Sequence, residues 1–195
     1  MAKFDITRNT HAVDALLERT ENPLHRQILE NWRRHMLLEV SGNWEGILAP
    51  DMTVRDPDYR MSIGGKLEIM RGLDAVGAFY EGLVTGGGNV ILLTNQEIVV
   101  TDNGYATNVN LTFFHQGHEL AAQGHTGLDD DKWYTSEGFF VEFWPYTKEG
   151  LLVGEYVAQM SPPIIREVDE ADVITPAEAK AALEPLIRPL PAYPA

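Results

Sequence analysis

The chain contains no cysteine in its 195 residues. It therefore has no disulfide bond, no thiolate nucleophile and no metal site built from cysteine. It also lacks any run of about 20 apolar residues that could cross a membrane, and no apolar segment of a secretion signal follows its charged N-terminus. We expect a soluble cytoplasmic protein, in which the glycosylation-type sequence Asn110-Leu111-Thr112 is a chance match.

Basic residues are few, since 15 Lys and Arg stand against 29 Asp and Glu, which gives a net charge of −14. Such a charge repels nucleic acids and anionic membranes and disfavours phosphorylated substrates. The glycines at 86–88 are not followed by the Lys and Ser or Thr of a phosphate-binding loop, and they fit the end of a helix instead. The expected partner is an apolar small molecule, with neither nucleic acid nor membrane as a partner.

A chain of this length with 44% hydrophobic residues can bury one good core. We predict a main domain over residues 22–160, a helical extension at 1–21 and a C-terminal tail rich in proline, acid and alanine at 161–195. Thr175 and Glu178 have the spacing of a capping box, which predicts a helix reaching about Arg188. We expect the tail to lie over the body or over a partner subunit.

The N-terminal third is predicted to be helical. A short helix is expected at 11–20, and Asn22-Pro23 predicts the start of a longer one that ends near Val40. Trp32 and His35 lie on the apolar stripe of this longer helix, so both should face the interior. A further short helix is expected at 43–50.

Two segments carry a family resemblance: residues 51–59 (DMTVRDPDY) and residues 71–83 (RGLDAVGAFYEGL). Pro57 cannot donate a ladder hydrogen bond, so a strand should end at Asp56. Together the two segments resemble the ketosteroid isomerases and the SnoaL-like polyketide cyclases of the nuclear transport factor 2-like superfamily, over residues 22 to 160. The resemblance implies a cone-shaped scaffold, on which Asp56 takes the position of the isomerase's proton-transferring base.

The second half alternates apolar and polar residues with tight turns between the runs. It predicts strands at 90–100, 105–115, 118–125, 133–144 and 151–160, joined as an antiparallel meander, with a hairpin or lid at 60–71. We therefore expect an α+β fold: a cone-shaped barrel of curved antiparallel sheet, packed on three N-terminal helices, with a C-terminal helical tail.

Two carboxylates are the candidate bases. Asp56 at an apolar cavity would have a raised pKa and could accept a proton from a weakly acidic carbon; otherwise it forms a turn hydrogen bond with Arg55 or Tyr59. Glu155 falls on the inward face of the last strand, together with Val157 and Gln159, if the strand register is correct. The cyclases that the chain resembles likewise use a carboxylate on a late strand.

Other residues are expected to bind or orient the substrate. His35 could be an acid–base partner or a hydrogen-bond donor, or a satisfied core histidine. Tyr80 coincides with a tyrosine of the isomerase hydrogen-bond network, although its helix face is also ordinary core. The isomerases use two oxyanion donors, a tyrosine on the long helix and a protonated aspartic acid on a late strand. In this chain the first region holds Trp32, Arg34 or His35, and Phe139 falls near the second. The expected substrate-binding set is Trp32, Tyr59, Tyr80, Glu137 and Phe139.

His115, His118 and His125 lie close in sequence to Glu119, which suggests a metal site, but exposed turn histidines explain them more simply, and we expect no metal and no cofactor. The predicted function is that of a cofactor-independent lyase, isomerase, dehydratase or cyclase acting on an apolar, oxygenated, aromatic or polycyclic molecule. Retro-aldol loss of an aldehyde from aryl-propanoids lies within this range. The alternative is a non-catalytic binding or dimerisation module.

Assembly is predicted from the alternation at 108–113. Val109, Leu111 and Phe113 should face the cavity, whereas Asn108, Asn110 and Thr112 form a polar, β-rich outer face. We expect a homodimer through this outer sheet face.

Overall fold

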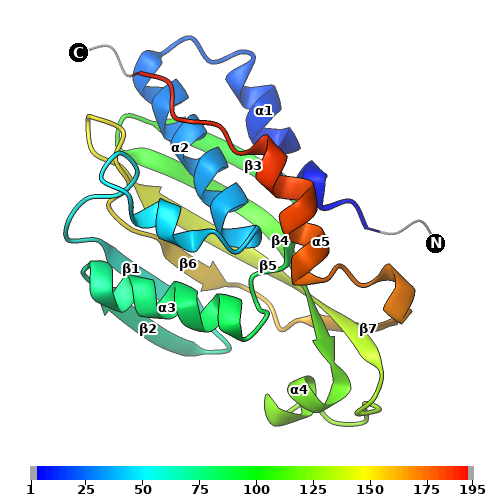
Figure 1. The fold of residues 1–195 in the computed structure, drawn as a ribbon. Coiled ribbons are helices and arrows are strands. Elements are labelled where there is room, and N and C mark those ends of the chain that lie inside the picture. Colours follow the sequence, from blue (N-terminus) through cyan, green and yellow to red (C-terminus); the bar gives the residue numbers. More distant parts are fainter. Residues whose placement is uncertain (1–3, 193–195) are drawn as a thin grey trace.

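The computed structural model describes residues 4–192, and its main element is a curved, unclosed sheet of seven strands (Figure 1). The strands are β1 Asp58–Ile63, β2 Lys66–Arg71, β3 Ile91–Thr101, β4 Gly104–Gln116, β5 Trp133–Pro145, β6 Tyr156–Gln159 and β7 Ile164–Val168. Their order is β2-β1-β6-β5-β4-β3, and β7 also pairs with β5. All pairs are antiparallel except β1 and β6, which are parallel. The expected α+β fold class is confirmed.

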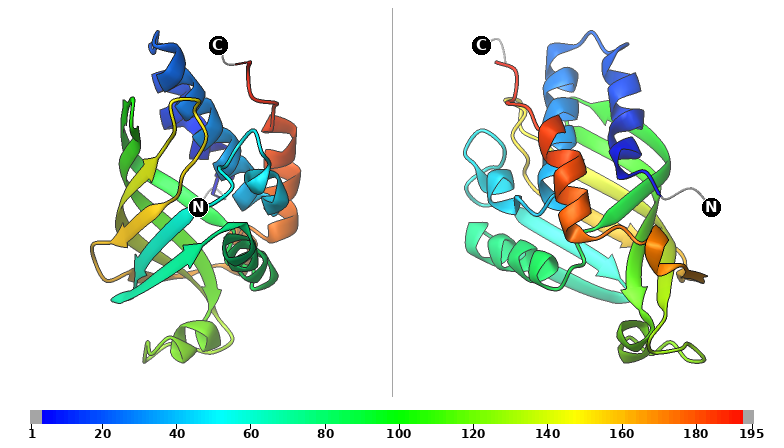
Figure 2. Two further views of the ribbon diagram at one scale, coloured as in Figure 1. Left: turned by 90° about the vertical axis from the view of Figure 1, so that its left-hand side faces the viewer. Right: turned by 45° about the vertical axis from the view of Figure 1, so that its right-hand side comes forward.

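All the α-helices except α4 lie on one side of the sheet (Figure 2). The α-helices are α1 His11–Leu17, α2 Pro23–Val40, α3 Leu73–Thr85, α4 Gly117–Ala122 and α5 Pro176–Leu183. Short 3-10 turns occur at η1 Ile6–Thr10, η2 Trp44–Leu48, η3 Glu170–Asp172 and η4 Glu184–Leu186. The helix α4 sits apart from the others, beyond the ends of β4 and β5 (Figure 1).

The central helix α2 begins where the sequence predicts. The side chain of Asn22 accepts hydrogen bonds from the backbone N–H groups of Leu24 and His25 at 2.9 and 3.2 Å, and Pro23 occupies the first turn, where its missing N–H costs nothing. Trp32 and His35 are buried at 2% and 0% exposure, as predicted. The helix packs against the concave face of the sheet and forms one wall of the interior.

Two predicted strands are absent. Residues 118–125 form α4 and the turn after it, because Gln116 and Glu119 form a capping box that starts a helix instead of continuing β4. No strand ends at Asp56. Around Thr53 the chain makes only an isolated bridge to Leu152. The first strand, β1, begins after Pro57 and pairs with β2 as the hairpin predicted at 60–71.

The two ends of the described chain share the main core. Ile6 and Val13 from the N-terminal segment, and Ala179 and Leu183 from α5, belong to the same hydrophobic cluster as α2. The capping box at Thr175 is present, and the α-helix that it starts ends at Leu183. Residues 193–195 of the predicted tail lie outside the described residues. Within residues 4–192 no helix is both long enough and apolar enough to span a membrane.

Candidate active site

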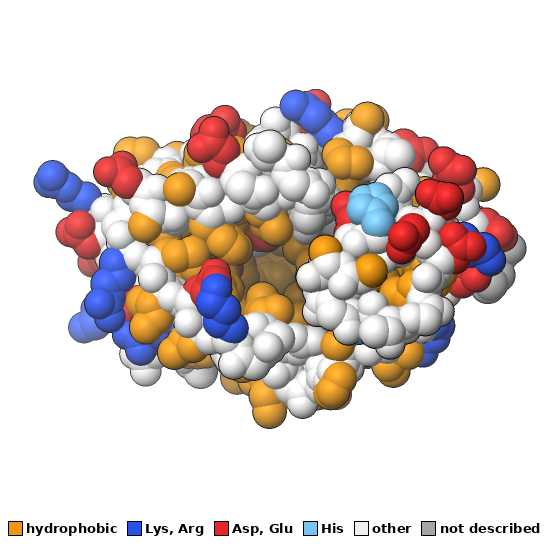
Figure 3. Space-filling model, turned by 90° about the horizontal axis from the view of Figure 1, so that it is seen from below, with side chains coloured by type: hydrophobic (Ala, Val, Ile, Leu, Met, Phe, Trp, Pro, Cys, Tyr) orange, Lys and Arg blue, Asp and Glu red, His pale blue; other side chains and the backbone are white. Residues whose placement is uncertain are grey.

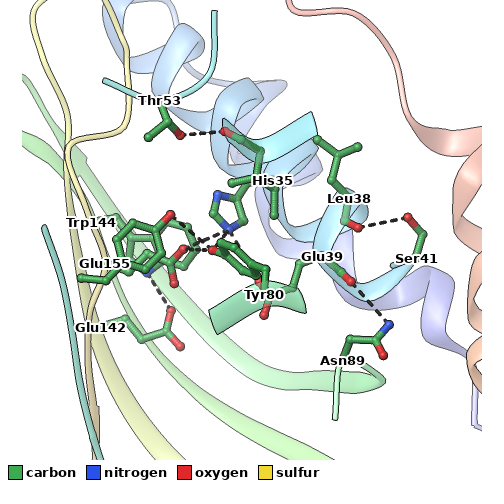
Figure 4. Close-up of polar contacts among 12 residues, drawn as sticks. His35, Leu38, Glu39, Ser41, Thr53, Tyr80, Asn89, Glu142, Trp144 and Glu155 are labelled. Carbon is green, nitrogen blue, oxygen red and sulfur yellow. Dashed lines mark hydrogen bonds and ion pairs between the residues drawn. The ribbon is translucent and has the colours of Figure 1, made fainter. Parts of the chain in front are cut away.

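A buried polar network joins three elements that are distant in sequence (Figure 4). Glu155 stands just before β6 and is 4% exposed. Its carboxylate accepts a hydrogen bond of 2.5 Å from the hydroxyl of Tyr80 on α3 and lies 3.0 Å from Nε2 of His35 on α2. The Tyr80 hydroxyl is also 2.8 Å from His35 Nε2. These three side chains therefore form a triangle in which each contacts the other two.

Local backbone geometry brings Glu155 to this position. The residue before it, Gly154, packs so closely on the backbone of Asp58 that a Cβ there would collide with the Asp58 carbonyl oxygen. The N–H of Arg60 donates to the carbonyl of Glu155 at 2.7 Å. Tyr59 lies between Asp58 and Arg60 on β1, and its hydroxyl oxygen is 3.3 Å from the hydroxyl oxygen of Tyr80. A glycine next to the glutamate therefore allows β1 and the residues just before β6 to bring Tyr59 and Glu155 into one network.

His35 is held in its protonated form. Complete burial by itself disfavours the imidazolium, but the Glu155 carboxylate outweighs burial, with help from Glu39 at 3.6 Å, and the pKa of His35 rises to about 9. At neutral pH the cation therefore faces two carboxyl groups. The other ring nitrogen, Nδ1, is buried without a hydrogen-bond partner among the described residues.

Glu142 on β5 is the second buried glutamate of the sheet, at 7% exposure. It accepts a hydrogen bond of 3.0 Å from the indole N–H of Trp144. Burial, reinforced by the negative charge of Glu155, raises the pKa of Glu142 to about 8, so this carboxyl group carries a proton at neutral pH. Burial also raises the pKa of Glu39 on α2, which His35 partly opposes.

The three glutamates line one cavity. This inner chamber, of about 120 Å³, lies between α2 and the sheet, and Glu39, Glu142 and Glu155 contribute its acidic groups. Its remaining lining is apolar, with aromatic walls from Trp32, Phe79, Phe113, Phe140 and Trp144. The indole N–H of Trp32 is buried and has no partner in the described part of the chain. The site therefore combines proton donors and acceptors with an apolar surface.

A larger opening adjoins the inner chamber. This outer cavity, of about 850 Å³, is lined by the tip of the β1–β2 hairpin, by β4 and β5, and by the segments after α4 and β6. Seen from below, the molecule has a deep hollow with hydrophobic side chains inside it (Figure 3). Ile63, Phe113 and Phe140 line both this cavity and the inner chamber that holds the buried glutamates.

Among the predicted site residues, the structure brings Trp32, His35, Tyr59, Tyr80 and Glu155 together. Trp32 stacks on Tyr105 with ring centroids 4.9 Å apart and lines the inner chamber. Val157 lines the same chamber and Gln159 the outer cavity, so the predicted inward register of this strand is correct.

Asp56 is placed elsewhere. It lies in an exposed bend before β1 and does not line either cavity, because the chain turns there instead of running as a strand toward the interior. Its carboxylate is therefore in contact with solvent, and it lacks the apolar surroundings from which its role as a base was inferred.

Glu137 and Phe139 lie on the outer face of β5. Phe139 is 39% exposed, and Glu137 is 3.6 Å from Arg166, which lies on β7. The inward residues of β5 are the even-numbered ones, including Phe140, Glu142 and Trp144. The prediction was wrong by one residue in strand phase, and this error concealed Glu142. An alternating Glu142-x-Trp144 pair on an aromatic strand is the signal that could have revealed it.

The histidines at the end of β4 and in the segment after it are not grouped as a metal site among the described residues. In residues 4–192 no group of three or more His, Asp or Glu side chains is placed to hold a metal ion. His118 is exposed on α4, whereas His115 and His125 line the outer cavity. Burial lowers the pKa of His115, and the nearby Glu119 partly opposes this.

Comparisons with known proteins give a result at the level of the fold. No family model and no curated protein matches the sequence. One similar solved structure is described as a SnoaL-like polyketide cyclase from Jannaschia sp. CCS1. It aligns with this protein with a TM-score of 0.53 at 13% sequence identity, and the alignment covers 73% of this chain and 91% of that one. A phenazine biosynthesis-related protein from Pseudomonas aeruginosa aligns with a TM-score of 0.50 at 13% identity, covering 78% and 96%. The chain has the nuclear transport factor 2-like fold of the superfamily that its sequence resembles.

Proposed function

We propose that the protein is a cofactor-independent enzyme of the lyase, isomerase, dehydratase or cyclase type, which moves a proton on an apolar, oxygenated small molecule. One observation carries this proposal: two buried glutamates, Glu142 and Glu155, line the same apolar chamber. Burial raises the pKa of Glu142 to about 8. Pairs of titratable groups in different environments are the usual arrangement for acid and base roles.

Glu142 is the proposed acid. Its protonated carboxyl group donates a hydrogen bond or a proton to an oxygen of the substrate, where negative charge develops. Glu155 is the proposed base, taking a proton from an adjacent C–H or O–H group. In a retro-aldol cleavage, for example, Glu155 would take the hydroxyl proton, the carbon–carbon bond would break to release an aldehyde, and Glu142 would protonate the electron-accepting end.

The neighbours of Glu155 position it. His35 and Tyr80 fix its carboxylate from two sides, at 3.0 and 2.5 Å, so it cannot rotate freely when a substrate enters. We therefore assign His35 to orientation and charge balance, and not to proton transfer with the substrate. The exposed position of Asp56 supports Glu155 over Asp56 as the base.

Amide substitutions test these roles once a ligand has been identified by native mass spectrometry of the purified protein. Glu142→Gln and Glu155→Gln preserve shape but remove the proton chemistry, so turnover should fall by about 10² to 10⁴. Asp56→Asn and Glu137→Gln are matched controls at exposed or outward positions and should leave turnover near that of the wild type. If the first two variants retain wild-type turnover while ligand binding persists, the protein is a non-catalytic binding module instead.

We also propose a homodimer through the outer face of the sheet. Phe139, Val141 and Phe143 on β5 are 39 to 43% exposed on that face, beside Asn108 and Asn110 of β4. A contiguous apolar patch bordered by polar side chains is typical of an interface. Sedimentation at micromolar concentration should give about twice the 21.8 kDa chain mass, and a species of 21.8 kDa alone would contradict the dimer.

A further inference from the structure

The inner chamber and the outer cavity are neighbours. Ile63, Phe113 and Phe140 line both of them, so the two cavities adjoin at these three apolar side chains. They come from β1, β4 and β5, which are fixed by continuous ladder pairing on the sheet. A molecule that reaches from Glu142 into the outer cavity would therefore lie against these three side chains.

The strand β5 gives the length of this space. Its inward residues Glu142 and Trp144 line the inner chamber, whereas Ser136 and Gly138 line the outer cavity, with Phe140 between them. Four residues of a strand extend roughly 13 Å, so each compartment accommodates about one ring with its substituents. The volume of the inner chamber agrees with this estimate, whereas the outer cavity, of about 850 Å³, has room for one ring and more. An apolar cavity of about 150 Å³ is known to hold benzene, and the inner chamber has about 120 Å³.

The outer cavity is suited to an uncharged group. Among its described lining residues Lys66 is the one Lys or Arg, and its ammonium group is paired with Glu68 at 2.5 Å and points into solvent at 77% side-chain exposure. The other polar side chains on its walls include His115, His125 and Gln159. Burial lowers the pKa of His115, which favours the neutral imidazole, and a neutral imidazole can either donate or accept a hydrogen bond. A hydroxyl or ether oxygen matches these groups, whereas a carboxylate or phosphate would find no free cation.

We propose that the substrate has two ring-sized units joined by a short linker: the reacting unit occupies the inner chamber, and an uncharged, oxygen-bearing second unit binds in the outer cavity near His115 and His125. This inference rests on the proposed function for the identity of the reacting end. The linker then lies against Ile63, Phe113 and Phe140. Single-ring compounds fill only one compartment and lose the contacts of the second.

Binding of two probe compounds tests the proposal without any turnover. Phenol supplies one ring, and 4-benzylphenol supplies two rings joined by one carbon. By isothermal titration calorimetry, 4-benzylphenol should bind the full-length protein about tenfold or more tightly than phenol, because the second ring buries additional apolar surface. Ser136→Phe places a ring in the outer cavity and should abolish this advantage while leaving the Kd of phenol within about twofold of wild type.

Matched variants keep the outcome decisive. Glu137→Phe adds the same ring to the opposite face of β5 and should leave the affinity ratio unchanged. If Ser136→Phe does not fold, Gln123→Trp narrows the same cavity from an exposed position and should lower the ratio. Equal affinity of the two probes in the wild type, or a ratio that survives filling of the outer cavity, would overturn the proposal. Glu142→Gln should keep the ratio, so failure of the catalytic assignment is measured separately from failure of the two-compartment assignment.

Discussion

The proton on Glu142 predicts an unusual stability change for Glu142→Gln. The pKa of Glu142 rises in the folded protein from its ordinary 4.5 to about 8, because the carboxyl group is buried beside the charge of Glu155. Between these two values the native state holds a proton that the unfolded chain has released. The contribution of this group to stability is therefore fully present below pH 4.5 and is lost as pH rises through about 8.

The magnitude follows from the two pKa values. They lie about 3.5 pH units apart, and each unit corresponds to about 1.4 kcal/mol, so the wild type should lose up to about 5 kcal/mol across this interval through Glu142 alone. Glutamine cannot ionise, and its side-chain oxygen can still accept the 3.0 Å hydrogen bond from Trp144. The free energy of unfolding of the variant should therefore equal that of the wild type, or be slightly lower, near pH 4.5, and it should be higher than that of the wild type at pH 8.

Urea unfolding at pH 5, 6.5 and 8 measures this difference. His35 also makes stability fall between pH 6.5 and about 9, since its folded pKa is raised as well, but it does so in both proteins and cancels. Glu137→Gln, on the outer face of the same strand, should follow the wild type at every pH. A constant free-energy difference between Glu142→Gln and the wild type from pH 5 to 8 would refute the assignment of a buried, protonated carboxyl group.

Three further predictions concern the network, the acid and the tail. Turnover should decline as pH rises through about 8, where Glu142 loses its proton, and a pH–rate profile that stays flat to pH 9 would argue against it as the acid. Tyr80→Phe removes the 2.5 Å hydrogen bond to Glu155 and should cost about 1 to 3 kcal/mol in urea unfolding, whereas an unchanged midpoint would show that the bond contributes nothing. Leu183→Ala in α5 should cost about 2 to 5 kcal/mol because Leu183 is fully buried, with the exposed Lys180→Ala as control; an unaltered melting temperature would mark the tail as a free appendage.

Local signals in the sequence determined much of the fold. Asn22-Pro23 and the Thr175 capping box start helices where expected, because the groups that satisfy a helix terminus are adjacent in sequence. Alternation along β4 correctly places Val109 and Leu111 inside, since only one face of that strand is apolar. The inward phase predicted for Glu155, Val157 and Gln159 is also that of the structure.

The phase of β5 and the assembly of the site were decided by tertiary structure. Phe139 and Phe140 place large apolar side chains on both faces of β5. The alternation of apolar residues therefore could not show which face points inward. Pairing of β5 with β4 and β6 places Glu142 on the inward face. His35 lies on α2, Tyr80 lies on α3, and Glu155 directly precedes β6. No local sequence pattern links these three positions. Their network exists because packing of the two helices on the curved sheet places three polar groups in one dry interior, where each needs the others as partners.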